Sequence, residues 1–321
     1  MTKPKSDPDK IGKYSTAVPA KSRPMLRSQR ILVYVNAVAR CGSIRKAADS
    51  LHMASSALNR RLLDLEEEVG TSLFERLPRG VRLTAAGEIY ISYVRRVLAD
   101  TELVGSQIER LRGLVRGHVK VAATESVAGN LLPDAVATFQ ADHPGVYFNI
   151  TIVAAEKLVD MVTSDTVDLI LTHELYDRDD LIVLASVPQP FCAVVRKSHP
   201  LVEKNNLRLR DCLPYPVALG DETMAGRTFI DRALHKASFT LEPVLVSNSI
   251  KVMHEFARLS GGIYFQFRIG TMAANSDMVV IPLNDRVLTQ GKLHLAMRRD
   301  RVLPVASAAF YEHLAGILQT I

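Results

Sequence analysis

Residues 44–70, IRKAADSLHMASSALNRRLLDLEEEVG, contain two short helical patterns that decide the fold of the N-terminal part. The first pattern follows Ser43, a good N-cap, and has apolar residues at helical spacing: Ile44, Ala47, Ala48 and Leu51. The second has an apolar stripe that ends at the stop signal Gly70: Leu58, Leu62, Leu65 and Val69. Helices this short must pack across each other, and a further helix over residues 28–42 completes a three-helix unit.

The second helix begins with short polar and basic side chains away from its leucine stripe: Ser55, Ser56, Asn59, Arg60 and Arg61. Such groups at a helix N-terminus suit a DNA major groove, where base edges offer donors and acceptors and phosphates flank them. The acidic run 66–68 lies at the other end, which predicts that it faces away from DNA. The alternative is an ordinary solvated helix face.

Residues 73–84, LFERLPRGVRLT, have the form of a small hairpin. Pro78, Arg79 and Gly80 form its tip, and Arg76 and Arg82 lie on its arms. A wing of this kind can place an arginine in the minor groove beside the groove that the helix occupies.

Composition is consistent with a DNA partner at one end of the chain. The 321 residues are 47% hydrophobic, enough for two or three domains, and carry a net charge of +6. Residues 1–117 hold 21 basic against 12 acidic residues, a net of +9, and the remainder has a net of −3. No signal peptide or membrane-length apolar run is present, which predicts a cytoplasmic protein without a membrane partner. The spacing of Cys41, Cys192 and Cys212 predicts neither disulfides nor a zinc site.

The segment GSIRKAADSLHMASSALNRRLLDLEEEVGTSLFER, followed by RGVRLTAAG, resembles the winged helix-turn-helix of the LysR-type transcriptional regulators. The resemblance implies a DNA-binding domain over residues 28–84 whose contacts come from ten residues: Ser43, Arg45, Ser55, Ser56, Asn59, Arg60, Arg61, Arg76, Arg79 and Arg82. This chain departs from the family pattern at Ala54, Ser55 and Asn59. A glutamine that pairs with adenine in relatives is replaced by the shorter Ser55, so their base preference does not carry over.

Residues 1–27 contain four prolines and no apolar period, and are expected to be a disordered basic arm or an inert tail. Residues 85–115 are expected to form a linker helix with a heptad seam: Tyr90, Val94, Val97, Thr101, Val104, Ile108 and Leu111. The seam predicts a homodimer, or a homotetramer built from it, rather than a monomer core helix. A dimer would bind a dyad-symmetric promoter site with half-sites about one helical turn apart.

From His118 the chain alternates strands and helices, which predicts an α/β module with a mainly parallel sheet. The resemblance implies a two-lobed, periplasmic-binding-protein-like domain over 118–321 that senses a small effector. Its first lobe is expected at about 118–187 and 269–321, and its second at about 192–262. The implied crossovers lie near 188–192 and 263–268.

Ligands in such sheets bind at the carboxyl ends of strands, beside helix N-termini. Those ends and the second crossover supply nine candidate effector contacts: Thr124, Ser126, Glu156, Thr172, His173, Gly220, Thr223, Phe265 and Gln266. Each alone could equally be a cap or a surface residue. Glu125, Glu156, Asp221 and Glu222 lie nearby and would repel an anion, so a simple carboxylate is expected to be disfavoured as the effector.

An enzyme is the main alternative, but the chain has no G-x-S-x-G, G-x-G-x-x-G, H-E-x-x-H or P-loop motif. No catalytic residue, metal site or cofactor is therefore expected. A metal cluster of His173 with Glu174 and Asp177 is disfavoured because neighbouring strand residues point to opposite faces. A sequence-indifferent architectural DNA-binding protein would not need residues 118–321, and a redox switch through Cys192 and Cys212 has no support. The expectation is a sequence-specific, effector-responsive transcription regulator, with RNA polymerase as a further expected partner.

Overall fold

The computed structural model describes residues 30–111, 116–173, 175, 178–235, 237–271 and 277–321. The chain divides into two compact units, Met1–Leu98 and Ala99–Ile321. The predicted arm of residues 1–27 lies outside the described residues, as do Glu174 and Asp177. Among the helices that the structure describes, none is long and apolar enough to cross a membrane.

The described part of the first unit contains three helices and a two-stranded hairpin, with the beginning of a long helix packed against them. The elements are α1 (Arg30–Cys41), α2 (Ile44–Ser50), α3 (Ser55–Val69), β1 (Phe74–Leu77), β2 (Gly80–Leu83) and α4 (Ala85–Leu111). The Ser43 hydroxyl accepts the Lys46 N–H as the N-cap of α2, and Gly70 ends α3 in the left-handed region. Leu58, Leu62 and Leu65 are buried in the core as expected, but Val69 is exposed.

Helix α4 does not present the whole predicted heptad seam to solvent. Val94 is fully buried in the core of the first unit, and Tyr90 and Val97 pack against the same core. The first half of the predicted seam is therefore used within the chain, because α4 must cover the open face of the three-helix unit. Apolar side chains are instead exposed at five positions of α4: Ile89, Tyr93, Val104, Ile108 and Leu111.

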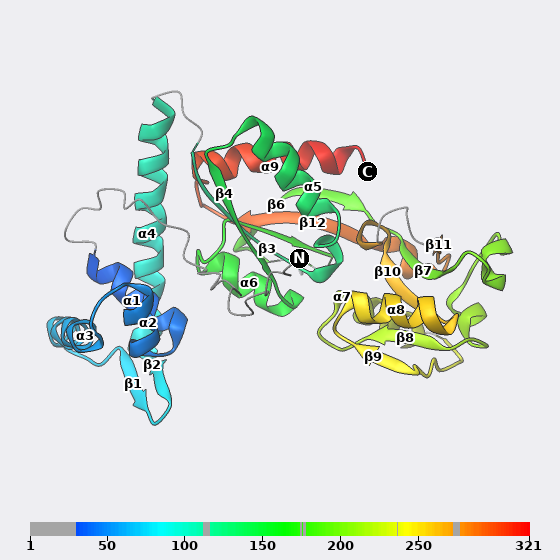
Figure 1. Cartoon of the computed structure of the whole chain (residues 1–321), viewed down its shortest axis with the longest axis horizontal. Helices are drawn as coiled ribbons and strands as arrows, with labels where there is room; N and C mark the ends of the chain where they lie inside the picture. The colour runs from blue at the N-terminus through cyan, green and yellow to red at the C-terminus, as the bar shows by residue number, and fades with distance from the viewer. Residues whose placement is uncertain (1–29, 112–115, 174, 176–177, 236, 272–276) are drawn as a thin grey trace, which may run out of the picture. The chain divides into compact units, whose positions relative to one another are not determined.

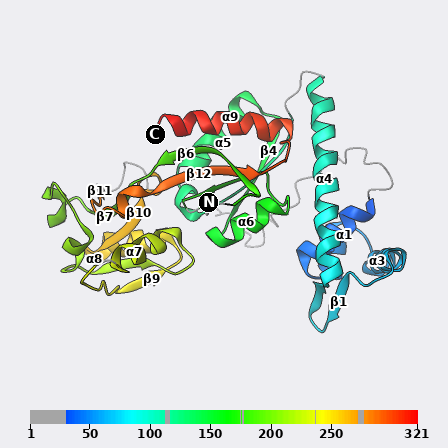
Figure 2. The same ribbon diagram turned by 180° about the vertical axis from the view of Figure 1, so that it is seen from behind.

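The first lobe of the second unit is a five-stranded sheet with helices on both faces (Figure 1). Its order is β4-β3-β5-β12-β6, from β3 (Gly117–Ala123), β4 (Val146–Ile152), β5 (Leu169–Thr172), β6 (Leu181–Pro188) and β12 (Lys292–Arg298). Helices α5 (Leu131–Asp142) and α9 (Val305–Gln319) cover one face, and α6 (Ala155–Thr163) covers the other. Figure 2 shows α5 and α9 side by side from behind.

The second lobe repeats this layering with the sheet order β11-β7-β10-β8-β9. Its strands are β7 (Phe191–Arg196), β8 (Val217–Gly220), β9 (Leu245–Ser247), β10 (Ile263–Phe267) and β11 (Met278–Pro282). Helix α7 (Ala225–His235) packs on one face and α8 (Ile250–Ser260) on the other. The short 3-10 helices η2 (Glu125–Val127) and η5 (Arg268–Gly270) lie against each other where the lobes meet.

Two expectations about these lobes were wrong. The sheets are mixed rather than mainly parallel, because β12 runs antiparallel to both β5 and β6 and β7 runs antiparallel to both β10 and β11. The return to the first lobe also comes later than residue 269, because β11 pairs with the open edge of β7 in the second lobe. Among the described strands that follow β6, β12 is the one that joins the sheet of the first lobe.

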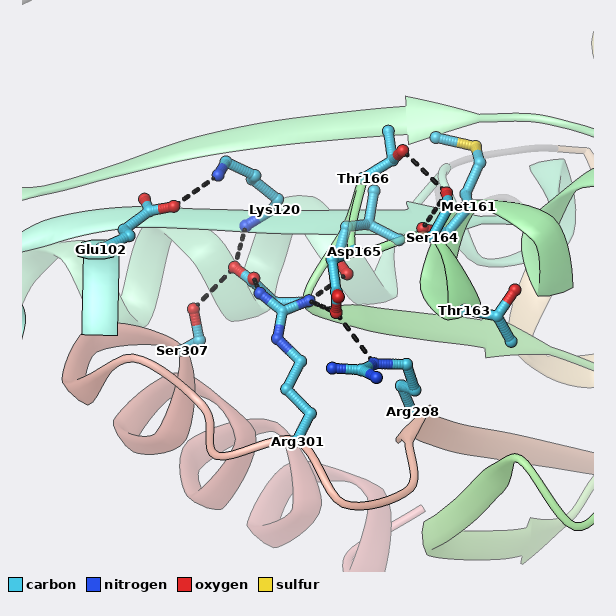
Figure 3. Close-up of polar contacts among 12 residues, drawn as sticks. Glu102, Lys120, Met161, Thr163, Ser164, Asp165, Thr166, Arg298, Arg301 and Ser307 are labelled. Carbon is cyan, nitrogen blue, oxygen red and sulfur yellow. Dashed lines mark hydrogen bonds and ion pairs between the residues drawn. The ribbon is translucent and has the colours of Figure 1, made fainter. Parts of the chain in front are cut away.

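A buried polar cluster connects strands and a helix of the first lobe (Figure 3). Asp168 accepts hydrogen bonds from the Lys120 N–H (3.0 Å), the Ser307 hydroxyl (2.8 Å) and Arg301 Nη2 (2.5 Å). Arg301 also pairs with Asp165, at 3.1 Å. These bonds join β3, the residues before β5 and the start of α9.

The C-terminal part of α4 is held to the same lobe by two contacts. The Lys120 ammonium pairs with Glu102 at 2.7 Å (Figure 3). The Val305 N–H donates to the buried Ser106 hydroxyl at 3.2 Å. The last turns of α4 are thus tied to β3 and to the beginning of α9.

Candidate functional site

The N-terminal end of α3 is a free polar and basic surface. Ser55, Ser56, Arg60 and Arg61 are exposed there, and Asn59 is half-buried. The N-cap residue Ala54 makes no side-chain hydrogen bond, so the first N–H groups of the helix receive no cap from it. A helix N-terminus of this kind attracts phosphate oxygens, and the adjacent arginines add positive charge.

The hairpin β1–β2 is held against α3 by polar contacts. Arg76 on β1 donates to the Asn59 side chain on α3 at 2.6 Å. Glu66 accepts the backbone N–H groups of Leu73 and Phe74 at 2.7 and 2.9 Å. Glu66 therefore positions the wing, a role that a charge pattern alone could not indicate.

Gly80 brings the wing close to the turn before α2. Its φ is +129°, and a Cβ there would lie 2.3 Å from the carbonyl oxygen of Gly42. The neighbouring Val81 N–H donates to that same oxygen at 2.9 Å. Arg79 at the tip is exposed, whereas Arg82 forms an ion pair with Glu75 at 2.7 Å. Arg79 thus lacks the neutralising partner that Arg82 has among the described residues.

Of the two other predicted DNA contacts, Arg45 is exposed on α2 and Ser43 is half-buried in its capping bond. The structure therefore brings α3, the start of α2 and the wing together in one unit. Which of these ten residues contact DNA remains a prediction.

A cavity of about 210 Å³ lies between the two lobes of the second unit. Six of the nine predicted effector contacts line it: Thr124, Ser126, Gly220, Thr223, Phe265 and Gln266. Apolar side chains from both lobes form much of the remaining wall, among them Ile152, Phe191 and Met253. An apolar cavity with a few convergent polar groups is the usual form of a small-molecule site.

Two hydroxyls of the cavity wall form a hydrogen-bonded chain with a buried histidine behind it. The hydroxyls of Thr124 and Ser126 lie 2.9 Å apart, and the Ser126 hydroxyl lies 2.9 Å from His173 Nδ1. His173 stacks on Phe267 with ring centroids 3.7 Å apart. Burial lowers the pKa of His173 to about 3, with a further contribution from His294, so the imidazole is neutral near pH 7. A neutral imidazole orients the two hydroxyls without bringing charge to the cavity.

Gln266 presents a buried amide at the cavity with an unused donor. Its Oε1 accepts the backbone N–H of Phe267 at 2.8 Å, which orients the amide and turns Nε2 the other way. Nε2 is buried and makes no hydrogen bond within the described part of the chain. The residue is only 3% exposed. A buried donor without a partner costs about 1–3 kcal/mol, which a bound acceptor would recover.

Glu125 is the carboxylate of the cavity, and it bridges the lobes. From η2 in the first lobe, its Oε1 accepts the Ile250 N–H at 3.0 Å and the Ser249 hydroxyl at 3.5 Å, both at the beginning of α8 in the second lobe. Burial raises the pKa of Glu125, and these two hydrogen bonds oppose the increase. Arg227 supplies the opposite charge in the wall, with its Nε paired to Asp231 at 2.9 Å.

The structure does not bring the other three predicted contacts to the cavity. Glu156 is exposed on α6, away from the wall. Thr172 is buried in the sheet, and His173 lies behind Ser126. The carboxylates of Asp221 and Glu222 also lie outside the wall, so of the four acids expected to repel an anion only Glu125 lines the cavity.

Sequence reasoning missed Arg227 and Asn248 as cavity residues. Arg227 lies on a helix, α7, and Asn248 follows the three-residue strand β9, which the sequence analysis did not use. Sequence reasoning also left Glu125 out of the predicted contacts, although Glu125 lies directly between Thr124 and Ser126.

The cysteines give no support to a redox switch. Burial raises the pKa of both Cys192 and Cys212 to about 12, so neither is a reactive thiolate at neutral pH. Within the described residues, no group of three or more histidine, cysteine or acidic side chains could hold a metal ion.

Two family models match the chain. Residues 30–88 match the bacterial regulatory helix-turn-helix protein, lysR family, and residues 112–319 match the LysR substrate binding domain. The first match spans the helices and wing described above. The second spans both lobes and the cavity between them.

Relatives and solved structures agree with these matches. The chain is 29% identical to the RuBisCO operon transcriptional regulator of Allochromatium vinosum, covering 89% of this chain and 94% of that one. It is also 29% identical to the HTH-type transcriptional regulator CysB of Burkholderia cenocepacia, covering 77% and 76%.

Among solved structures, a full-length OxyR variant from Pseudomonas aeruginosa has the same fold with a TM-score of 0.67 at 18% identity, covering 93% of this chain and 96% of that one. Full-length CbnR in complex with its target DNA has a TM-score of 0.61 at 20% identity, covering 89% and 98%.

Proposed function

The chain belongs to the LysR family of DNA-binding transcription regulators, with a C-terminal substrate-binding domain, and from this premise we propose how its own residues read DNA and sense an effector. Members of this family are regulators rather than enzymes.

The start of α3 is proposed to enter the major groove, with the wing in the adjacent minor groove. The observation that carries this proposal is the Arg76–Asn59 hydrogen bond, because it fixes the wing relative to the exposed face of α3. Ser55, Ser56 and Arg60 would then meet base edges and phosphates. Arg79 at the wing tip would meet the minor groove, where narrow A·T tracts attract arginine.

The partner is proposed to be promoter DNA with dyad symmetry, bound by a homodimer in the cytoplasm. The support is the set of exposed apolar side chains along α4, since a second copy of the helix could cover them. A homotetramer built from such dimers and contact with RNA polymerase are part of the same proposal.

The cavity between the lobes is proposed to bind the effector and to act on α4. Thr124, in the cavity wall, directly follows β3. Lys120 on β3 pairs with Glu102 of α4. A change at the cavity that shifts β3 would therefore bear on the end of the proposed dimer helix.

Sequencing of genomic fragments that the purified chain retains tests the DNA-binding proposal. A shared dyad-symmetric motif is the expected result. Fragments without a common motif would contradict sequence-specific binding. Repeating the selection with Ser55→Ala, which shortens one proposed base contact, should relax the motif at a limited number of positions and leave the rest unchanged.

A further inference from the structure

Resting on the proposed effector function, we infer that the effector of this chain is zwitterionic: an amino acid or a close derivative with a free ammonium group and an acceptor group such as a carboxylate. The inference depends on the groups that the cavity wall presents and on which of their hydrogen-bonding positions are already used.

The acceptor side of the cavity is Glu125. Both of its hydrogen bonds go to Oε1, from the Ile250 N–H and the Ser249 hydroxyl. Oε2 accepts no hydrogen bond from the residues that the structure describes, so one carboxylate oxygen remains for a ligand. The carboxylate lines the cavity and is half-buried, and a negative charge in such a place is stabilised by a cationic partner.

The donor side is Gln266 with Arg227. The Gln266 amide Nε2 is buried at the cavity wall and has no partner among the described residues. Arg227 lines the same cavity and uses Nε for Asp231 and Nη1 for the Gly220 carbonyl, at 2.9 and 3.3 Å, which leaves Nη2. These donors suit a ligand carboxylate, and the Thr124 hydroxyl can donate to it when His173 Nδ1 donates to Ser126 and Ser126 donates to Thr124.

The charges of the wall point to the same class. Glu125 and Arg227 are its two charged side chains among the described residues, so the wall holds both signs. Arg227 is already paired with Asp231, whereas Glu125 has no cationic partner among the described residues. A simple anion would use the donors and leave the Glu125 charge without a cation. A simple amine would leave the Gln266 donor unused. A zwitterion satisfies both sides.

The test is calorimetric titration of the full chain with each common L-amino acid. For any that binds, the N-acetyl derivative and the matching 2-hydroxy acid are titrated as well, since each lacks the ammonium. We expect at least one amino acid to bind, and both ammonium-free analogues to bind about tenfold more weakly or worse.

Glu125→Gln is the matched variant, because glutamine keeps an oxygen for the Ile250 N–H but removes the charge. The affinity for the amino acid should fall about tenfold, while that for the N-acetyl derivative should not fall. Glu156→Gln is the control, since Glu156 is exposed and lies outside the cavity, and it should change neither affinity.

The inference is overturned if no amino acid binds, if the ammonium-free analogues bind as tightly, or if Glu125→Gln leaves amino-acid affinity unchanged. Succinate, benzoate and sulfate are included in the screen, so that failure of the zwitterion inference can be distinguished from failure of the proposed effector-binding function. Binding of one of these anions that Thr124→Val abolishes, without an amino-acid response, would retain the cavity as the effector site and remove the zwitterion. If a ligand binds and neither Thr124→Val nor Glu125→Gln changes its affinity, both the cavity as the effector site and the zwitterionic effector are contradicted.

Discussion

Replacement of Asp168 by asparagine should destabilise the first lobe far more than an exposed charge replacement does. Asp168 is 1% exposed, and its carboxylate accepts hydrogen bonds from the Lys120 N–H, the Ser307 hydroxyl and Arg301. Asparagine has nearly the same volume, so no cavity forms. The variant has one acceptor oxygen where the carboxylate has two, and it turns an amide NH₂ toward groups that are themselves donors.

The magnitude follows from the charge that remains. Arg301 is also buried, and without Asp168 it keeps only Asp165 as an ionic partner, at 3.1 Å. Breaking a buried ion pair by removing one partner costs about 3–5 kcal/mol. Because Asp165 still compensates part of the Arg301 charge, we expect the lower end, about 3 kcal/mol.

Hydrogen exchange measured by mass spectrometry is the suitable assay, because the chain has two units and need not unfold in one transition. Peptides from β3 and α9 report the opening free energy of the first lobe, and peptides from α1–α3 report the other unit. Asp180→Asn is the control, since the Arg178–Asp180 pair is solvent-exposed, and little change is expected there. Equal protection of β3 and α9 in the two variants would refute the reasoning.

Three further predictions concern the wing and the effector domain. Arg79→Ala should weaken DNA binding by about 1 kcal/mol, mainly for sites with A·T-rich flanks, and reduce the salt slope by about one; unchanged affinity on both kinds of flank in a mobility-shift titration would remove the wing tip from the interface. Gly80→Ala should also weaken DNA binding, because the added Cβ would meet the Gly42 carbonyl and displace the wing; affinity equal to the wild type would show that the wing tolerates the shift. The low pKa of His173, about 3 because of burial, makes the unfolded chain bind a proton that the folded unit does not. The contribution of neutral His173 to the free energy of unfolding is therefore complete above about pH 6.5 and falls by about 1.4 kcal/mol per pH unit as the pH drops toward 3. His173→Gln should flatten that part of the pH profile of thermal unfolding, and parallel profiles for the two proteins would contradict the prediction.

The N-terminal fold was predictable because its information is local. Helical spacing, the Ser43 cap and the Gly70 stop each act within a few residues, and α2 and α3 begin and end close to where these signals place them. The contacts that hold the wing were not predictable, because the apolar spacing of α3 places Glu66 and Asn59 on its polar face and does not show which groups their side chains bind. The first half of the heptad pattern in α4 was misleading as a sign of a dimer seam, because Val94 packs into the core of its own chain against α1 and α3.

The cavity was predictable only in part, for a related reason. Strand ends in the first lobe identify Thr124 and Ser126, because parallel strands β3, β4 and β5 finish at one edge. Arg227 comes from a helix in the other lobe, and only the three-dimensional arrangement of the lobes brings it to the cavity. The role of Glu125 likewise depends on α8, which follows it by more than a hundred residues in the chain.

Hydroxyl-radical footprinting of the full chain on a DNA fragment recovered by selection tests the central claim most directly. The account predicts two protected half-sites related by a dyad, each flanked by minor-groove protection that Arg79→Ala removes. A single asymmetric footprint, or protection that does not depend on sequence, would contradict it.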